Sequence, residues 1–233
     1  MARRVALNRE RVLKAAIRLA DKDGIEALSM RRLAKELGVE AMSLYNHVAN
    51  KDELLSGIAD MAANEVELPT DETDWKAAIR RSSISTRDIL LRHRWATNLW
   101  MSQKGGGPAR LRHEDWILRT LREAGLPRDL VYHALHILDA YVLGFTRMQL
   151  TVINLGDDLA GLAEDFLRRF PTDEYPDFAD HVRQHLDPPA GEEGGFELGL
   201  DLILEGLERA RGAQLAGPIR RLPPRDSQPP RYR

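Results

Sequence analysis

Residues 24–55 read GIEALSMRRLAKELGVEAMSLYNHVANKDELL, which predicts two short helices, a tight turn between them and a longer helix after them. Ser29 is placed to cap the first helix and Gly38 to end it. A second short helix is expected over residues 40–47. The run Asn50-Lys51-Asp52-Glu53 is typical of a capping box and predicts the start of the longer helix.

A further helix precedes this stretch. Between Asn8 and Asp23 apolar residues recur at helical spacing, and Gly24 is placed to end the helix. Three helices within about 48 residues, with a glycine in the turn between the second and the third, form the layout of a helix-turn-helix. The third helix of that motif can enter the major groove of DNA. Three short helices also build bundles that bind no DNA, so the layout alone leaves both interpretations open.

The residues on and beside the third helix have side chains suited to contacts with DNA. Hydroxyl, amide, ring, thioether and cationic groups are present there: Arg31, Met42, Ser43, Tyr45, Asn46, His47 and Lys51. We expect polar side chains such as Ser43 and Asn46 to meet base edges and Met42 to contact a thymine methyl group. Arg31 and Lys51 flank the helix as cations directed at phosphates.

The same stretch resembles the signature of the TetR family of transcriptional regulators, most specifically in the run LYNHVANK at residues 44–51. The match extends over residues 8–60. Residues 74–75, 82–93 and 195–207 are similar, more loosely, to the regulatory domain of the tetracycline repressor. The resemblance implies an all-α homodimer that binds a palindromic operator in double-stranded DNA.

The resemblance also implies roles for single residues and a mode of regulation. Tyr45, His47 and Lys51 match backbone-contacting positions, Arg31 lies in the second helix facing the groove, and four positions point toward base edges: Ala41, Met42, Ser43 and Asn46. Members of the family usually repress by blocking a promoter. A small molecule in the body then moves the two heads away from the spacing of ~34–36 Å that one DNA turn requires, by binding the wider state more tightly.

The remainder of the chain is expected to be helical as well, which makes the fold all-α. Long helices are predicted at about residues 74–93, 108–124, 128–152 and 194–212, with a shorter one at 95–103. Pro69 and the acidic run 71–74 indicate a linker, and residues 154–193 indicate a variable connection with one or two short helices. We therefore predict a DNA-binding head with a connecting helix at 1–67, a helical regulatory domain at 68–212 and a disordered basic tail at 213–233.

Two body helices, 128–152 and 194–212, are apolar on nearly all sides. A large monomer core is one explanation, but the body has few other helices to cover both faces. We therefore expect these helices to pair across a two-fold axis in a homodimer. The residues assigned to this interface are His133, His136, Ile137, Ala140, Gly144, Gly199, Leu202, Ile203 and Gly206.

An effector pocket is predicted among the first four body helices, beneath the head. Its candidate lining residues are Trp95, Asn98, Trp100, Met101, Trp116, Phe145, Met148 and Gln149. Such a wall suits a planar or lipophilic molecule, whereas the alternative is that these residues simply fill the core. Trp100 and Glu67 stand where the tetracycline repressor has histidines that anchor its drug–magnesium complex, so we expect neither tetracycline nor magnesium.

His133, His136 and Asp139 recur every three residues on one predicted helix. This spacing permits a metal site, and with it a metal-dependent enzyme, but hydrogen bonding at the dimer interface is the preferred interpretation. Enzyme motifs such as H-E-x-x-H, G-x-S-x-G and the phosphate-binding loop are missing from the sequence. We therefore expect no metal, no cofactor and no catalytic activity.

Composition narrows the class of protein further. The 233 residues carry a net charge of −2, are 43% hydrophobic and include no cysteine, which excludes disulfides and thiolate metal sites. Residues 1–55 hold 11 Lys/Arg against 8 Asp/Glu, while residues 56–208 hold 16 against 27. A basic head on an acidic body suggests that only the head meets a polyanion. With neither a secretory signal nor a membrane span in the sequence, we expect a cytoplasmic protein without a membrane partner.

The sequence therefore predicts a ligand-responsive transcriptional repressor. An activator or dual regulator with the same fold is the first alternative. A helical small-molecule-binding module that no longer binds DNA is the second.

Overall fold

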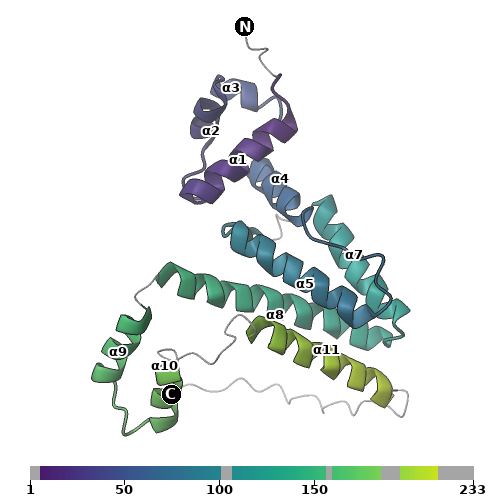
Figure 1. Ribbon diagram of the computed structural model, residues 1–233. Helices are drawn as coiled ribbons and strands as arrows, with labels where there is room; N and C mark the ends of the chain where they lie inside the picture. The colour runs from purple at the N-terminus through teal and green to yellow at the C-terminus, as the bar shows by residue number, and fades with distance from the viewer. Residues whose placement is uncertain (1–5, 101–106, 156–158, 185–194, 215–233) are drawn as a thin grey trace, which may run out of the picture.

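The computed structural model describes residues 6–100, 107–155, 159–184 and 195–214, and every regular element in these ranges is a helix. A small head, α1 to α4, sits on a larger helical body, and α3 lies near the end of the molecule farthest from α11 (Figure 1). The helices are α1 Arg9–Asp23, α2 Met30–Leu37, α3 Ala41–Leu44, α4 Lys51–Ala63, α5 Trp75–Arg92, α6 Ala96–Trp100, α7 Pro108–Glu123, α8 Arg128–Leu155, α9 Leu159–Arg169, α10 Pro176–Gln184 and α11 Gly195–Gln214. The all-α prediction is confirmed.

Local capping sets the boundaries of the head helices. The Ser29 hydroxyl accepts a hydrogen bond from the Arg32 N–H at 3.2 Å, and Gly38 ends α2 in the left-handed conformation, with φ of 65°. The Asn50 side chain accepts from the Glu53 N–H at 2.8 Å, while the Glu53 carboxylate accepts from the Ala49 N–H at 2.6 Å. These reciprocal bonds form a capping box, displaced by one residue at the backbone donor.

The third helix is shorter than predicted. The sequence suggested residues 40–47, but α3 covers only Ala41–Leu44, and a tight turn follows. In this turn the N–H groups of Tyr45 and His47 donate to carbonyls three residues earlier, at 3.2 and 2.9 Å. Such bonds are typical of a 3₁₀-like end, which a short helix adopts when no strong C-cap continues it.

The cores of head and body meet at α4. Leu33, Leu44 and Ile58 are fully buried in the head, and the same cluster continues through α4 to Trp100 on α6 and Leu143 on α8. A second cluster joins α5, α7, α8 and α11 around Leu121 and Leu200. The connecting helix α4 therefore packs into both parts of the molecule, so that its position depends on both.

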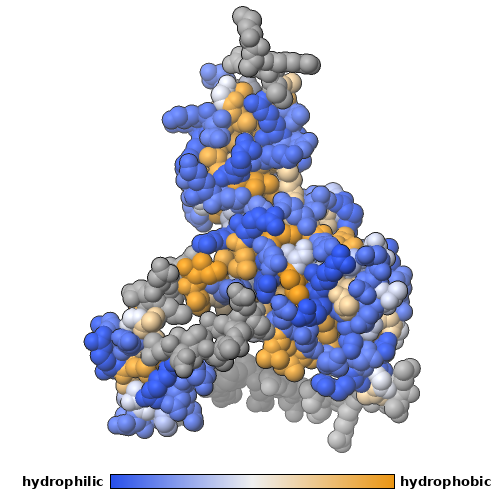
Figure 2. All heavy atoms as spheres, in the orientation of Figure 1, coloured by the Kyte–Doolittle hydropathy of each residue, from blue (hydrophilic) through white to orange (hydrophobic). Residues whose placement is uncertain are grey.

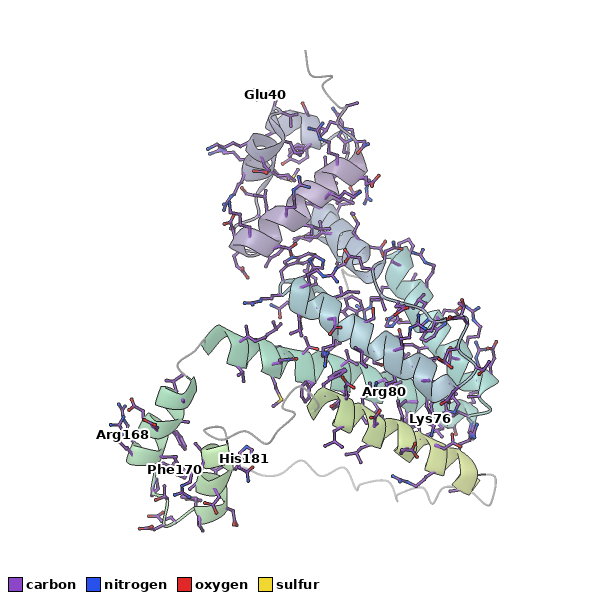
Figure 3. The ribbon with its side chains drawn as sticks, viewed as in Figure 1. Glu40, Lys76, Arg80, Arg168, Phe170 and His181 are labelled. Carbon is purple, nitrogen blue, oxygen red and sulfur yellow. The ribbon has the colours of Figure 1, made fainter. Side chains whose placement is uncertain are left out.

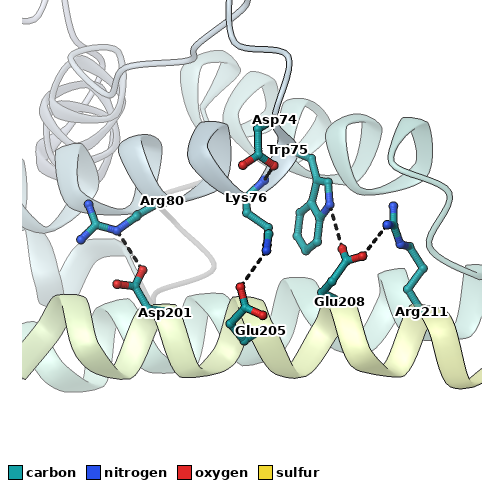
Figure 4. Close-up of polar contacts among 8 residues, drawn as sticks. All are labelled: Asp74, Trp75, Lys76, Arg80, Asp201, Glu205, Glu208 and Arg211. Carbon is teal, nitrogen blue, oxygen red and sulfur yellow. Dashed lines mark hydrogen bonds and ion pairs between the residues drawn. The ribbon is translucent and has the colours of Figure 1, made fainter.

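A row of polar contacts holds α11 against α5. Lys76 Nζ lies 2.7 Å from a Glu205 oxygen, Arg80 Nε donates to Asp201 at 2.8 Å, and the Trp75 indole donates to Glu208 at 3.2 Å (Figure 4). Lys76 and Arg80 line the side of α5 that faces α11 (Figure 3). The acidic side of α11 therefore contacts α5 of the same chain, and a different side of α11 stays available for contacts with other molecules.

Helices α9 and α10 form a hairpin that projects from the end of α8, away from the α5–α7–α11 bundle (Figure 1). The Phe166 and Phe170 rings stack with centroids 4.7 Å apart, and Phe178 packs against both of them. The prediction of one or two short helices between residues 154 and 193 is confirmed. Within the described ranges, α8 runs three residues farther than expected and α11 two, and the tail after residue 214 lies outside them.

In the part of the chain that the structure describes, no helix is both long and apolar enough to cross a membrane.

Candidate DNA-binding surface and effector site

The side chains on and after α3 are held outward by two buried anchors. Leu44 is completely buried and Val48 almost so, which fixes one side of this segment in the head core. On the other side Met42 is 75% exposed, and the side chains of Tyr45 and Asn46 are exposed as well. Between residues 41 and 48 five positions are buried or half-buried and three are exposed, which leaves a narrow outer edge of polar and apolar groups that suits the floor of a DNA groove.

The remaining predicted DNA contacts lie around this edge. Lys51 at the start of α4 and Arg31 on α2 are exposed, whereas Ala41, Ser43 and His47 are half-buried. Figure 3 labels Glu40, which directly precedes α3, at the tip of the head. The structure thus places all eight predicted residues on α2, α3, the following turn and the first residue of α4.

A surface hollow of about 610 Å³ adjoins α3 and contains two cations that the sequence interpretation missed. Arg11 on α1 and Lys35 on α2 line it together with Ser43. Both are charged residues on amphipathic helices, and nothing in their local pattern distinguishes them from ordinary solvent-facing cations. Only the packing of α1 against α2 brings them beside α3.

The body encloses a small cavity between the four helices for which a pocket was predicted. Its volume is about 10 Å³, and its lining comes from α5, α6, α7 and α8: Ser83, Thr86, Trp100, His113, Ile117, Leu138, Asp139, Val142 and Leu143. A cavity of this size holds about one water molecule. Its polar groups are unusual for a core, because two of them are titratable.

The surroundings of His113 and Asp139 shift the pKa of each group in the direction that favours its uncharged form. Burial lowers the pKa of His113 to about 4, and its Nε2 lies 3.4 Å from the Ser82 hydroxyl. Burial, followed by the negative charge of Glu114, raises the pKa of Asp139 to about 6. Desolvation dominates in both cases, since it penalises whichever form carries the charge.

Of the seven predicted effector residues that the structure describes, Trp100 lines this cavity and the other six do not. Trp116 is buried but lines a separate groove beneath the linker, and Phe145 packs on Phe196 of α11 with ring centroids 5.4 Å apart. Asn98 is exposed and Met148 is 70% exposed. The sequence pattern could not distinguish the aromatic residue that lines the cavity from those that line a groove or pack on another helix. Each of them fits an apolar helix face, whatever that face contacts in the folded chain.

The three remaining predicted effector residues are Met101, Gln149 and Trp95. Met101 lies outside the described residues. Gln149 on α8 buries its side-chain oxygen without a hydrogen-bond partner, as does Thr97 on α6, so the contact between these helices holds unused hydrogen-bonding capacity. Trp95 is turned toward the head, where its indole N–H donates to Asp21 at 2.6 Å.

Asp21 forms a latch between head and body, defined here as Asp21, His93 and Trp95. The Asp21 carboxylate on α1 contacts His93 Nδ1 at 2.8 Å in addition to the Trp95 indole, and both of these body side chains are buried. Helix α6 begins directly after Trp95 and ends with Trp100 in the cavity. One five-residue helix therefore connects the cavity to the head.

A second contact joins the connecting helix to α7. Gly107 gives α7 no side-chain cap, and the Asp60 carboxylate of α4 instead accepts a hydrogen bond from the Ala109 N–H at 2.7 Å. A Cβ atom at Gly107 would overlap the Asp60 carboxyl. Glycine is therefore required here by the close approach of Asp60, and the first turn of α7 follows any movement of α4.

The predicted dimer residues lie mostly on one outward face of α8 and α11. Ile137, Ala140 and Gly144 on α8 are exposed, as is Leu202 on α11, and Leu198 joins them although its exposure was not predicted. Gly206 has open space around it, while Ile203 packs partly on the body core. Figure 2 shows hydrophobic atoms over the end of α8 nearest α9 and over α11.

Gly199 does not belong to this outward face. A Cβ atom there would overlap the Tyr141 ring of α8 in the same chain. The Tyr141 hydroxyl donates to the Phe196 carbonyl at 2.8 Å, which explains the close approach. The small residue is required for packing within the chain, and the sequence could not show which neighbour it accommodates.

His133, His136 and Asp139 do not converge on one point. Six residues along a helix place His133 and Asp139 about 120° apart around the axis of α8, and the two histidines are exposed while Asp139 lines the cavity. The described part of the chain contains no group of three potential metal ligands. The proposed clustering of these three residues is therefore wrong, whereas both histidines stay on the outward face.

Comparison with known proteins finds a family match for each half of the chain. Residues 12–58 match the family of bacterial regulatory proteins of the tetR type, and residues 68–211 match the tetracyclin repressor-like C-terminal domain. The chain is 34% identical to the transcriptional repressor DrrR1 of Streptomyces coeruleorubidus, covering 87% of this chain and 77% of that protein. It is 30% identical to the class A tetracycline repressor from Escherichia coli, covering 86% and 90%.

Solved structures agree with this assignment. Apo ActR from Streptomyces coelicolor has a TM-score of 0.76 and 29% identity, over 90% of this chain and 99% of ActR. BioQ, solved with its double-stranded DNA operator, has a TM-score of 0.59 and 28% identity, over 88% and 99%. With both halves matched in order and these relatives covered over 77% to 99% of their length, the chain belongs to the TetR family of bacterial transcriptional regulators.

Proposed function

We propose that this regulator is a repressor that binds a palindromic operator as a homodimer and releases it when a small molecule enters the body. One observation carries the proposal. A single chain combines an outward α3 edge, anchored by Leu44 and Val48, with a cavity of buried polar groups to which the head is linked through α6.

The DNA-binding part rests on the chemistry of the α3 edge. Exposed Met42 and Asn46 present an apolar and an amide group to base edges, and Tyr45 and Lys51 present a hydroxyl and a cation to phosphates. BioQ, a relative with the same fold, was solved on its operator. A dimer would set two such edges against successive turns of DNA.

The dimer part rests on the outward face of α8 and α11. Leucine and isoleucine side chains there are exposed over two adjacent helices, and contiguous apolar surface of this kind marks an interaction site in a protein of this size. A face that pairs with itself gives a closed, two-fold assembly.

The effector part rests on the cavity between α5 and α8. ActR was solved in complex with actinorhodin, so one relative binds a small molecule, and another, DrrR1, is named a repressor. Here the lining combines Trp100 with aliphatic and hydrogen-bonding groups, which suits a planar molecule. Entry must displace lining side chains, and Trp100 moves with α6, the helix that the Asp21 latch ties to the head.

The test is recovery of bound fragments from the source genome at near-physiological salt, where non-specific binding is weak. We expect a short inverted repeat, bound by the wild-type chain and not by a Tyr45→Ala/Lys51→Ala double variant. Compounds are then screened for release of that repeat. Failure to enrich any repeat above the double variant would contradict the repressor assignment. Enrichment of a repeat that tightens with every active compound would favour an activator or co-repressed regulator.

A further inference from the structure

Asp139 of α8 lines the effector cavity. It extends from α8 between Leu138 and Val142, and no residue of the described ranges donates a hydrogen bond to it or pairs with it. Asp139 is half-buried. A carboxyl group that is partly withdrawn from water and has no donor destabilises the fold, and an apolar side chain of similar volume would not have this cost. The position is therefore better explained by a ligand than by folding.

The described charged groups around Asp139 leave the charge of its own carboxylate uncompensated. On α7, Arg110 pairs with Glu114 at 2.9 Å, which compensates its charge, and it donates another N–H to the Trp100 carbonyl. His113, also on α7, is uncharged at neutral pH because burial lowers its pKa to about 4. His136 on α8 is exposed, and α5 contributes only the uncharged residues Ser83 and Thr86.

This arrangement discriminates between ligands by charge. An ionised Asp139 can only accept hydrogen bonds, so a carboxylate or phenolate placed beside it meets repulsion and receives no hydrogen bond from the Asp139 side chain. A protonated amine supplies both the positive charge and the N–H donors. The Trp100 indole, which meets the His113 ring edge-on with centroids 6.3 Å apart, offers an aromatic face at the same cavity and adds cation–π attraction.

We propose that Asp139 selects the effector by charge, and that the effector class is a planar aromatic molecule bearing a protonated amine, whose ammonium group pairs with the Asp139 carboxylate while its ring contacts Trp100. This inference rests on the proposed effector site. It goes beyond the expectation of a planar or lipophilic ligand, since it states the sign of the charge and the residue that reads it.

Two probes with the same ring system test the proposal on the full-length protein without DNA. They are 9-(aminomethyl)anthracene, whose ammonium group makes it a cation at neutral pH, and anthracene-9-carboxylate, an anion; binding is followed by calorimetry. At pH 7.5 we expect the wild-type chain to bind the cation at least about tenfold more tightly than the anion, the effect of one charged hydrogen bond. Towards pH 5 this preference should shrink, because Asp139, with a pKa of about 6, becomes protonated in the free protein.

Matched variants assign the effect to the cavity. Asp139→Asn keeps the shape of the side chain and should abolish both the preference and its pH dependence. Asp129→Asn makes the same change at an exposed position in the first turn of the same helix and should leave both unchanged. Asp139→Leu serves as a second cavity variant, and the melting temperatures of all three show whether they fold.

Three results would overturn the proposal: equal binding of the two probes, binding of neither, or a preference that persists in both Asp139 variants. The same preparations are tested against the recovered operator. Operator binding without charge selectivity refutes only this inference, whereas loss of operator binding in the wild-type chain refutes the proposed function itself.

Discussion

The two buried titratable groups of the cavity affect folding stability in opposite directions as pH falls. Asp139 has a raised pKa, so the folded chain holds its proton more tightly than the unfolded chain and gains stability as pH falls from about 6 towards 4. His113 has a lowered pKa, so the unfolded chain takes up a proton first and the folded chain loses stability as pH falls from about 6.5 towards 4. In the wild-type chain these contributions partly cancel.

The variant Asp139→Asn should reveal the contribution of His113 to the pH dependence of folding stability. We expect the variant to be more stable than the wild-type chain at pH 7.5, by an amount on the order of 2–3 kcal/mol if the full shift is realised. We also expect its stability to fall more steeply between pH 7 and pH 5. Urea unfolding at several pH values measures both quantities. Parallel pH profiles for variant and wild type would show that Asp139 is not desolvated in solution.

Side chains at the α3 edge should divide into two classes. Tyr45→Ala or Lys51→Ala should weaken binding to every DNA sequence by a similar factor, since phosphates carry no sequence information, and the Lys51 change should reduce the salt dependence. Met42→Ala or Ser43→Ala should instead alter preference at one or two base pairs, at a cost of about 1–3 kcal/mol for the favoured base. Binding to operator variants with single base changes measures this. The division is wrong if all four variants scale every site equally.

At the scale of elements, α6 is the shortest route from the cavity to the head. Its first residue follows Trp95, whose indole N–H donates to Asp21, and its last residue, Trp100, lines the cavity. Five helical residues span only about 7.5 Å. A shift of Trp100 within so short and rigid a segment must appear at the Asp21 latch, because the helix cannot absorb it by bending.

Trp95→Phe should loosen the head without unfolding it. The variant keeps an aromatic ring in the junction but removes the hydrogen bond to the Asp21 carboxylate, so we expect operator affinity to fall about three- to tenfold. Fluorescence anisotropy with labelled operator measures the change.

Trp75→Phe is the matched control, since it removes an indole–carboxylate hydrogen bond to Glu208, on the α5–α11 row and away from the head. Equal losses in the two variants would show that the junction has no special part in placing the head.

At the scale of the whole molecule, one side of α11 packs against α5 of the same chain, and another side is exposed. Its acidic residues pair with Lys76 and Arg80 of α5, and Arg87 stacks over the Phe196 ring at 4.6 Å. Leu198 and Leu202 point elsewhere and stay exposed, beside the exposed apolar residues of α8. An operator with two half-sites requires this second contact, because one head reads only half of a palindrome.

If the proposed dimer forms through this face, Leu202→Glu should convert it to a monomer, since two carboxylates would face each other across a two-fold axis without partners. Sedimentation velocity measures the molecular mass, and operator affinity should fall with it. Leu111→Glu is the control: Leu111 on α7 is 60% exposed, close to the 62% of Leu202, but lies outside the proposed interface. A Leu202→Glu chain that still sediments as a dimer would move the interface to another face.

Much of the head could be predicted from the sequence, because the start and end of each of its helices depend on residues a few positions away in the chain. Asn8, Ser29 and Asn50 cap helices through residues three positions away, and Gly24 and Gly38 end helices at positive φ as expected. The length of α3 was overestimated, since no local signal marks the tight turn at residues 45–47. The four helices around the cavity were also predicted correctly, because their apolar periodicity is strong.

The sequence by itself determined the all-α class, the capped helices of the head, and an α3 edge with DNA-contacting chemistry, because each depends on residues a few positions apart. Only the tertiary structure decided that Trp95 bonds to Asp21 across 74 positions, that Gly199 accommodates Tyr141, and that Asp139 faces the cavity while His133 faces outward. These outcomes depend on how helices distant in the chain pack and rotate against each other, and an apolar or polar periodicity is the same for several such rotations.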